Sequence, residues 1–344
     1  MGRWLNIWFA LTLAIFVGVA CREKEMPGEG SVILTFTTVE PLTRAVVDDD
    51  PADGGGIAID NNVPDLFIAI ANYSGNIIAT YPGENTECIE TSATQISIRF
   101  TKTLASQDWT SGDYTVYAVA NTAGGLWGAP NGSAAWAAVT PASSLDALCF
   151  SELSSSDLPT VTDRMPLSAK GTLSVNEYGN GQAELELLRC VAKIGFKFKN
   201  ETGQALTLTD CIVTIKAISP TQGYVFPRAN DATGTARDLT LINSNLNIGT
   251  GVTTELYGNL LVFPSVAPSQ TVGSRYYCDI EFKINNELKS FTDLPIHDKQ
   301  SYDILALGRN QYLQIETRIN KGLDVSFDFV VNDWNINSEE IIFH

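Results

Sequence analysis

The stretch AELELLRCVAKIGFKFK, from Ala183 to Lys199, decides the fold that we expect for this chain. Apolar and polar residues alternate along nearly all of it, which is the period of a β-strand with one buried and one exposed face. The alternation is too long for one strand in one sheet environment. We therefore expect the stretch to cross from a first domain into a second, before residues 200–203 turn the chain back.

Strand patterns continue on both sides of this stretch, and no segment of any length shows a helical period apart from a short candidate at 144–150. Both faces of the strand at 112–121 are apolar, which indicates a central position in its sheet. We predict an all-β chain with two antiparallel β-sandwich domains in tandem, at residues 45–188 and 189–344. The other expected strands lie at 31–38, 63–71, 77–81, 95–100, 208–219, 255–263, 275–284, 287–291, 312–319, 325–331 and 341–343.

The composition is that of a folded, acidic protein. The chain has 344 residues, of which 44% are hydrophobic and 18% charged, enough to build one large or two ordinary domains. Its formal net charge of -17 argues against nucleic acid and anionic membrane surfaces as partners, because both would repel it.

Residues 1–20 resemble an export signal, with Arg3 before an apolar run that is short for a membrane-spanning helix. The run ends at Gly18-Val19-Ala20-Cys21, which resembles a bacterial lipobox. We expect Cys21 to be acylated and to anchor the chain to the outer membrane. An ordinary signal peptide followed by an incidental cysteine is the alternative.

The segment 21–44 holds a charged tether and one alternating strand, in which Val32, Leu34 and Phe36 share a face. Pro41 ends the strand. Arg44-Ala45 then opens into an acidic, glycine-rich stretch that we expect to be accessible to proteases. The acids lack the spacing and the closing glutamate of a calcium loop, so we predict no metal site there.

The cysteines after Cys21 show no zinc-binding spacing. An oxidising compartment would allow disulfides with one thiol left over, whereas buried free thiols would behave as small hydrophobic residues. Both readings, and the pairing, stay open for Cys88, Cys149, Cys190, Cys211 and Cys278.

Two tryptophans, Trp127 and Trp136, lie in a region rich in alanine, glycine and asparagine. Indole rings stack on sugars, so these residues are candidates for glycan contact. The alternative is that each ring packs its loop onto the domain.

Enzyme classes find no support in the sequence. Only two histidines occur, and the motifs of serine hydrolases, zinc proteases, phosphate-binding loops and dinucleotide-binding folds do not. A pair of glycosidase carboxylates cannot be selected among 39 acidic residues. We predict a protein without catalytic residues or cofactors.

Several motifs in order give the chain a resemblance to the fimbrillins, the lipoprotein pilins of type V fimbriae of Bacteroides-type bacteria. These motifs are GDYTVYAVAN at 112–121, MPLS at 165–168, LRCVAKI at 188–194, GRN at 308–310 before Tyr312, VNDW at 331–334 and IIF at 341–343. The chain departs from the family pattern at Gly18 in the lipobox and at Leu167 after Pro166.

The resemblance implies two transthyretin-like β-sandwich domains, lipid anchoring at Cys21, and cleavage by an Arg-specific protease between Arg44 and Ala45. It further implies that removal of the strand holding Val32, Leu34 and Phe36 opens a groove. A strand of another copy or a related pilin would fill it by β-strand addition, so that an outer-membrane precursor becomes part of an adhesive surface fimbria.

Stalk, anchor and tip subunits share this fold, and the sequence does not separate them. An anchor would keep its lipid and its first strand. A surface lipoprotein that binds glycans through Trp127 and Trp136 and does not polymerise is a further alternative.

Overall fold

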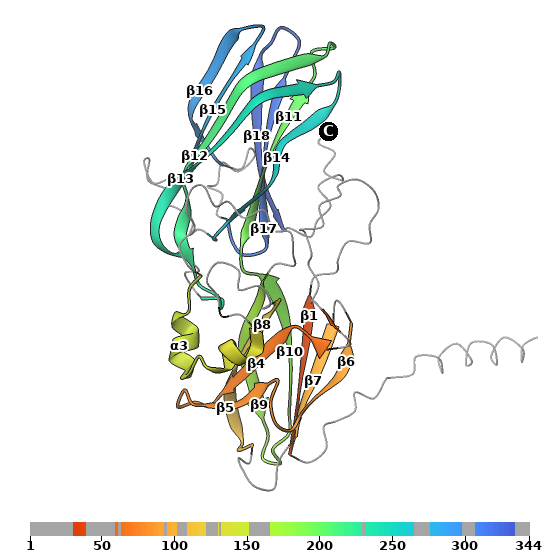
Figure 1. Ribbon diagram of the computed structural model, residues 1–344, viewed down its shortest axis with the longest axis vertical. Helices are drawn as coiled ribbons and strands as arrows, with labels where there is room; N and C mark the ends of the chain where they lie inside the picture. Colours follow the sequence, from red (N-terminus) through yellow and green to blue (C-terminus); the bar gives the residue numbers. More distant parts are fainter. Residues whose placement is uncertain are drawn as a thin grey trace, which may run out of the picture.

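The computed structural model describes residues 30–38, 59–60, 63–92, 95–101, 109–121, 130, 132–150, 166–228, 232–264, 276–297 and 307–333. Of these residues 66% are in strands, as the alternation in the sequence predicts, and the two described helices are one to two turns long. The strands form two bodies that lie end to end along the longest axis of the molecule (Figure 1).

The N-terminal body is built on one eight-stranded sheet with the order β5-β4-β8-β9-β10-β1-β7-β6. A separate two-stranded pair, β2 and β3, and two short helices, α2 and α3, accompany it. The elements are β1 (Ser31–Thr38), β2 (Ile59–Asp60), β3 (Val63–Pro64), β4 (Leu66–Ala71), β5 (Ile77–Tyr81), β6 (Thr86–Thr91), β7 (Gln95–Thr101), β8 (Gly112–Ala120), α2 (Gly132–Ala137), α3 (Ala142–Ala147), β9 (Leu167–Val175) and β10 (Gly181–Arg189).

The inward side chains of this sheet gather in a single core, which we call the N-terminal core. Residues of β4 and β8 meet residues of β1, β7 and β10 in it, so the sheet must curve around its own inner face. The opposite faces of β4 and β8 are also buried, through Phe67, Tyr117 and Val119. The two apolar faces expected for residues 112–121 are therefore confirmed.

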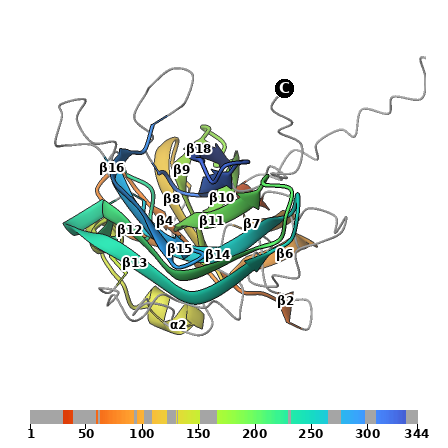
Figure 2. The same cartoon turned by 90° about the horizontal axis from the view of Figure 1, so that it is seen from above.

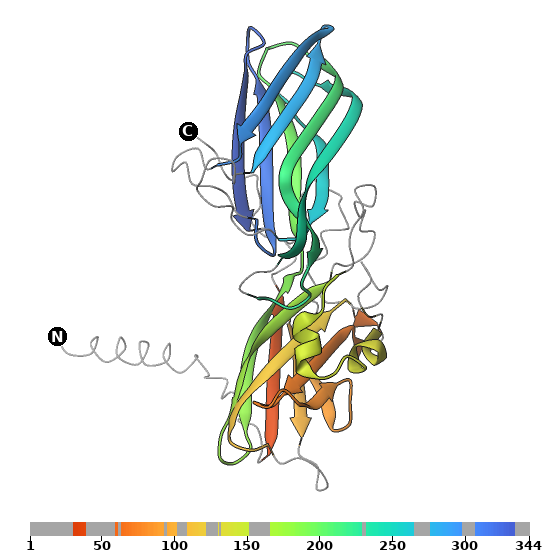
Figure 3. The ribbon, with the colours of Figure 1, turned by 90° about the vertical axis from the view of Figure 1, so that its left-hand side faces the viewer.

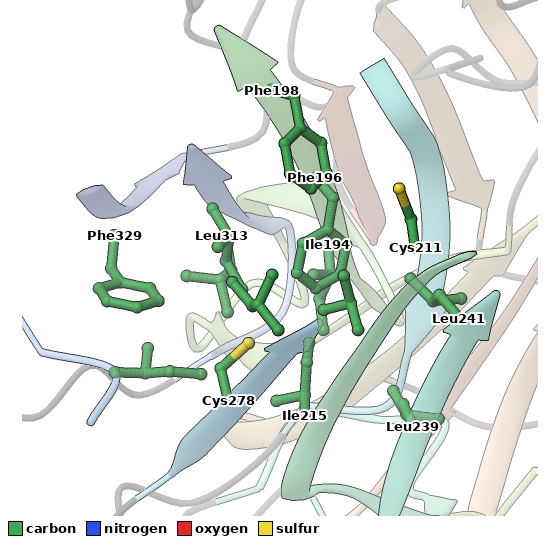
Figure 4. Packing of buried hydrophobic residues seen from close by; sticks show 14 of the residues in the cluster. Ile194, Phe196, Phe198, Cys211, Ile215, Leu239, Leu241, Cys278, Leu313 and Phe329 are labelled. Atoms are coloured by element: carbon green, nitrogen blue, oxygen red, sulfur yellow. The ribbon is translucent and has the colours of Figure 1, made fainter. Parts of the chain in front are cut away.

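The C-terminal body is a sandwich of two four-stranded sheets, β14-β11-β17-β18 and β13-β12-β15-β16. Inward residues of both sheets share one core, in which Phe196 and Phe198 of the first sheet face Cys211 and Cys278 of the second (Figure 4). The strands are β11 (Ala192–Asn200), β12 (Leu206–Gly223), β13 (Ala232–Ile248), β14 (Thr253–Val262), β15 (Tyr277–Ile284), β16 (Glu287–Pro295), β17 (Gln311–Ile319) and β18 (Val325–Asp333).

The long stretch that decided our fold expectation does pass from one sheet to another. Arg189 ends β10 in the N-terminal sheet, and Ala192 begins β11 in the C-terminal sandwich, with only Cys190 and Val191 between them. The chain thus changes sheets within two residues, and Figure 3 shows β10 running directly up into β11.

The long hairpin of β12 and β13 also reaches the junction of the two bodies. Its strands curve from the sandwich toward the N-terminal body (Figure 1), and from above they are seen to bow along one side of the sandwich (Figure 2). The bend coincides with an irregularity in the pairing between Ile215 and Ser219, where Ala217 has a positive φ of 55°. This bend carries Val225 and Phe226, just beyond β12, into the space between the bodies.

Candidate strand-addition site and domain junction

The first strand of the chain lies inside its sheet. β1 pairs with β10 in parallel, from Val32 opposite Gly181 to Thr38 opposite Leu187. On its other side it pairs with β7 in antiparallel orientation, from Ser31 opposite Thr101 to Thr37 opposite Gln95. β1 therefore supplies both backbone ladders that join the β6–β7 hairpin to the other five strands of the sheet.

The side chains of β1 complete the N-terminal core. Val32, Leu34 and Phe36 are each 0% exposed, as the alternation of residues 31–38 predicts. Full burial of a residue of this size stabilises the fold by roughly 1.5 to 3 kcal/mol. The three together contribute at most about 5 to 9 kcal/mol, because an extended unfolded chain overstates the area buried.

Polar contacts fix the position of β1 along its neighbours. The side-chain oxygen of Asn180, in the turn before β10, accepts a hydrogen bond of 3.2 Å from the backbone N–H of Ser31. On the outer face, the hydroxyl oxygens of Thr35 and Ser97 lie 3.1 Å apart. The site is therefore a slot one strand wide, with an apolar floor and a polar stop at one end.

The residues expected to process and anchor the chain, Cys21, Arg44 and Ala45, lie outside the described residues, as do residues 39–58 after β1. No helix within the described ranges is long and apolar enough to cross a membrane. The part of the chain that the structure describes also holds no group of three or more metal-binding side chains.

The two tryptophans that suggested glycan contact differ in what the structure shows. Trp127 lies outside the described residues. Trp136, on α2, is 1% exposed, with its ring stacked 6.0 Å from Phe67 and edge-on to Phe226 at 6.1 Å. Because both neighbours are core residues, Trp136 offers no open ring face to a sugar in this structure. Glycan contact at Trp127 stays a prediction.

A second buried cluster, which we call the junction cluster, joins the two bodies. Phe67, Tyr117 and Trp136 of the N-terminal body meet Phe226 and Phe263 of the C-terminal body within it. The segment after α3 adds backbone pairing, because Phe150 donates its N–H to Gly223 and Val225 donates its N–H to Leu148, at 2.9 and 3.0 Å.

Buried polar residues accompany this cluster, and they come from the motifs that carried the family resemblance. The guanidinium of Arg309 donates to the hydroxyl of Ser168 at 3.2 Å, to the carbonyl of Val225 at 2.9 Å and to the carbonyl of Tyr224. Arg189 donates to the side-chain oxygen of Asn310 at 2.7 Å. Three motifs far apart in the sequence thus meet at one place.

The alternation along residues 183–199 predicts that their charged side chains lie on the exposed face of the strand, and for Arg189 and Lys193 this is wrong. They are 6% and 9% exposed. Lys193 lies on the outer face of β11, which is covered at the junction, whereas Arg189 lies on the same side of β10 as the core residue Leu187. Lys193 lies 5.3 Å from the ring centre of Tyr312 instead.

All five described cysteines are free thiols. Cys190, Cys211 and Cys278 are buried, which agrees with the reading of these residues as small hydrophobic groups. Burial, with a smaller effect of the Asp210 charge, raises the pKa of Cys211 to about 11. Burial also raises the pKa of Cys278, so both thiols are protonated at neutral pH.

Comparison with known proteins identifies the family of this chain. A family model described as fimbrillin-A associated anchor proteins Mfa1 and Mfa2 matches residues 83–340 of this chain. No curated protein sequence matches this chain significantly.

Among solved structures, a candidate cell adhesion protein of Parabacteroides distasonis superposes with a TM-score of 0.53 at 12% identity, over 88% of this chain and 97% of that one. The tip fimbrial protein Mfa3 of Porphyromonas gingivalis, with a C-terminal truncation, gives 0.52 at 10% identity, over 88% and 99%. At these identities the likeness shows a shared fold.

Proposed function

Because this chain belongs to the family of fimbrillin-A associated anchor proteins, we propose that it is a fimbrial subunit of the bacterial cell surface that assembles by strand exchange. The observation that carries the proposal is the place of β1. This strand comes from the start of the chain, yet it lies between β7 and β10, and its pairing partners begin 64 and 150 residues after Ser31. The family is one of structural fimbrial proteins, and we propose no catalytic role.

The proposed sequence of events begins with export and acylation at Cys21, which holds the precursor on the outer membrane. In the precursor the chain fills its own slot with β1. An Arg-specific protease then cuts between Arg44 and Ala45, and β1 leaves together with the lipid anchor. The backbone groups of β7 and β10 lose their partners, and the N-terminal core loses three buried side chains.

A strand of another subunit then takes the vacant place. Unpaired strand edges beside an apolar floor are costly in water, so a strand with apolar residues at alternate positions is bound in compensation. We propose that this strand comes from the C-terminal region of a second copy or a related pilin. A contact of this kind uses different surfaces on the two subunits, and its repetition builds a filament.

The N-terminus of protein taken from the cell surface tests this proposal. Mass spectrometry of the wild-type chain should find Ala45 as the first residue, whereas Arg44→Gln should leave chains that begin at acylated Cys21. Arg22→Gln removes the arginine next to Cys21 and is the matched control, which should be processed like the wild type. Wild-type chains that all keep Cys21 and β1 would exclude polymerisation by this route.

That last outcome would support a second candidate, an anchor subunit that keeps its lipid and β1. The description of the matching family as anchor proteins favours it. An anchor would still present surfaces to a neighbouring subunit, but its own N-terminal slot would stay filled by β1. Pull-down of fimbriae with uncleaved chains at their base would identify this role.

A further inference from the structure

The loss of β1 would leave two strand edges facing each other. In the eight-stranded sheet, β7 is bonded to β1 on one side and β6 on the other, and β10 is bonded to β1 and β9. Neighbouring strands lie about 4.8 Å apart, so β7 and β10 are roughly 10 Å apart while β1 is between them. Without β1 the sheet consists of five strands and a separate β6–β7 hairpin.

The directions of these two edges allow them to pair with each other. β1 runs parallel to β10 and antiparallel to β7, so β7 and β10 are antiparallel. Each inward residue of β1 now pairs with one residue of β7 and one of β10, and these two residues would lie opposite each other once β1 has left. Phe100 would then lie opposite Gly181, Ile98 opposite Ala183, and Ile96 opposite Leu185.

This register keeps every side chain on its present face. Ile96, Ile98 and Phe100 point into the N-terminal core, and Ala183 and Leu185 pack against the same core. The intervening pair, Ser97 and Glu184, lies on the opposite face, where both now flank Thr35. A direct ladder therefore needs translation of β7 by one strand spacing, with no rotation of the strand.

The sizes of the facing side chains also fit. The two largest inward residues at this end of β7, Phe100 and Ile98, would lie opposite the two smallest of β10, Gly181 and Ala183. Large residues opposite small ones interdigitate and fill space that the departure of β1 leaves empty.

The hairpin differs from the rest of the sheet in its described contacts with the junction cluster. The junction cluster takes residues from β4 and β8, which tie that half of the sheet to the C-terminal body, but none from β6 or β7 among the described residues. The β6–β7 hairpin is thus held by its ladder to β1 and by the N-terminal core, and both weaken when β1 leaves.

We propose that the β6–β7 hairpin closes onto β10 when β1 is lost, which reseals the sheet with seven strands and removes the slot. The inference rests on the proposed departure of β1. It adds that β7 competes with the incoming strand for the edge of β10. An incoming strand must bind before the slot closes or must displace β7 from β10. Closure protects a cleaved subunit from indiscriminate edge pairing and makes assembly depend on delivery of the partner strand.

A disulfide between positions 97 and 184 tests closure. The chain carries Ser97→Cys and Glu184→Cys, with Cys88 and Cys149 replaced by serine and a site for a specific protease inserted between residues 45 and 58. In the intact chain the two positions lie two strand spacings apart, beyond the Cα separation of about 5.5 to 6 Å that a disulfide requires. After cleavage and loss of β1, we expect the disulfide to form in most chains.

A second pair is the matched control. Thr35→Cys with Ser97→Cys joins directly opposed residues of β1 and β7, so its disulfide should form in the intact chain and should retain β1 after cleavage. A peptide of residues 30–38 gives a second readout. It should bind β1-less chains at a rate that levels off with peptide concentration, because β7 must first leave β10, and it should not bind chains with the 97–184 disulfide.

Two results would overturn the inference. One is a chain that has lost β1 but forms no 97–184 disulfide under the conditions that oxidise the control pair. The other is a binding rate that rises in proportion to peptide concentration throughout, which indicates a slot that stays open. If cleaved chains never release β1, the proposed strand exchange fails, but Leu34→Asp in the full chain still expels β1 from its slot and tests closure by the same disulfide.

Discussion

β1 and β17 occupy equivalent places in the two bodies, and they differ in how the chain holds them. β17 lies between β11, to which it is parallel, and β18, to which it is antiparallel. β1 has the same relation to β10 and β7. Both strands are fully buried on their inner faces, through Leu34 and Phe36 in β1 and Leu313 and Ile315 in β17.

The connections of the two strands are different. β17 runs into β18 through a tight turn, in which the N–H of Asn320 bonds the carbonyl of Asp324 at 2.9 Å. The residues just before it, Arg309 and Asn310, are bound at the junction. β1, by contrast, is followed in the described chain by β2, which is not in its sheet. Burial alone therefore does not distinguish the two strands, and the proposed exchange of β1 relies on this difference in their connections.

The largest effect expected from this difference comes from placing a charge in each strand. Leu34→Asp and Ile315→Asp should each destabilise their own body by more than about 4 kcal/mol, because a carboxylate would be buried without a partner. Urea unfolding, followed by hydrogen exchange in each body, measures the loss.

Rescue by peptide then separates the two strands. A peptide of residues 30–38 should bind Leu34→Asp in place of β1 and restore the free energy of unfolding of its N-terminal body, whereas a peptide of residues 311–319 should not restore the sandwich in Ile315→Asp. Equal rescue of both variants would show that the chain connection has no bearing on whether a strand can be exchanged.

A smaller effect on stability is expected from a substitution at the junction, where the two bodies are in contact. Arg309→Met keeps the apolar stem of the residue but removes its hydrogen bonds to Ser168, Tyr224 and Val225. Loss of a buried charged donor from such partners costs about 2 to 4 kcal/mol. We expect lower stability together with a wider range of interdomain distances, measured by X-ray scattering and by distance labels on the two bodies.

The control for this variant is Arg99→Met on β7, where the arginine is part of an exposed ion pair of 3.6 Å with Glu87. Such pairs contribute about 0 to 1 kcal/mol. If Arg309→Met lowers stability but leaves the interdomain distances unchanged, the junction cluster alone fixes the two bodies.

The sequence predicted the strands with clear alternation, and the match of the fimbrillin-associated family model confirms the resemblance that their motifs carried. β1 and β5 have the expected bounds. The sequence missed β6 and all of β13, because TECIET and the threonine- and asparagine-rich β13 lack an apolar period. These strands form because β7 and β12 offer them backbone partners, which is tertiary information.

The junction was missed for a related reason. Nothing in local periodicity indicates that the outer face of β11 is covered at Lys193, or that a charged residue at the end of β10, Arg189, is buried. Arg309 was visible only as part of a motif, since a buried arginine that binds backbone carbonyls has no sequence signal of its own. The burial of Val32, Leu34 and Phe36, in contrast, was readable from the alternation of residues 31–38, whereas acylation at Cys21 and cleavage at Arg44 stay predictions.

The smallest expected effect is in thiol reactivity, which reports how easily each body opens. Cys88 on β6 is half-buried and packs against the N-terminal core, whereas Cys211 and Cys278 are buried in the sandwich. Because the pKa of Cys211 is raised to about 11, only about one molecule in ten thousand carries the reactive thiolate at pH 7. Cys88 should therefore be alkylated first by iodoacetamide, by a margin that tryptic mass spectrometry can follow.

The same labels can report the hairpin motion without any engineered cysteine. Since Cys88 lies on the hairpin that we expect to move, loss of β1 should change its labelling rate, while Cys211 and Cys278 should keep theirs. Raising the pH toward 9 should speed labelling of the sandwich thiols only in proportion to the thiolate formed. If loss of β1 exposes Cys211 as strongly as Cys88, the two bodies open together, and the proposed contrast between an exchangeable β1 and a fixed β17 does not extend to their dynamics.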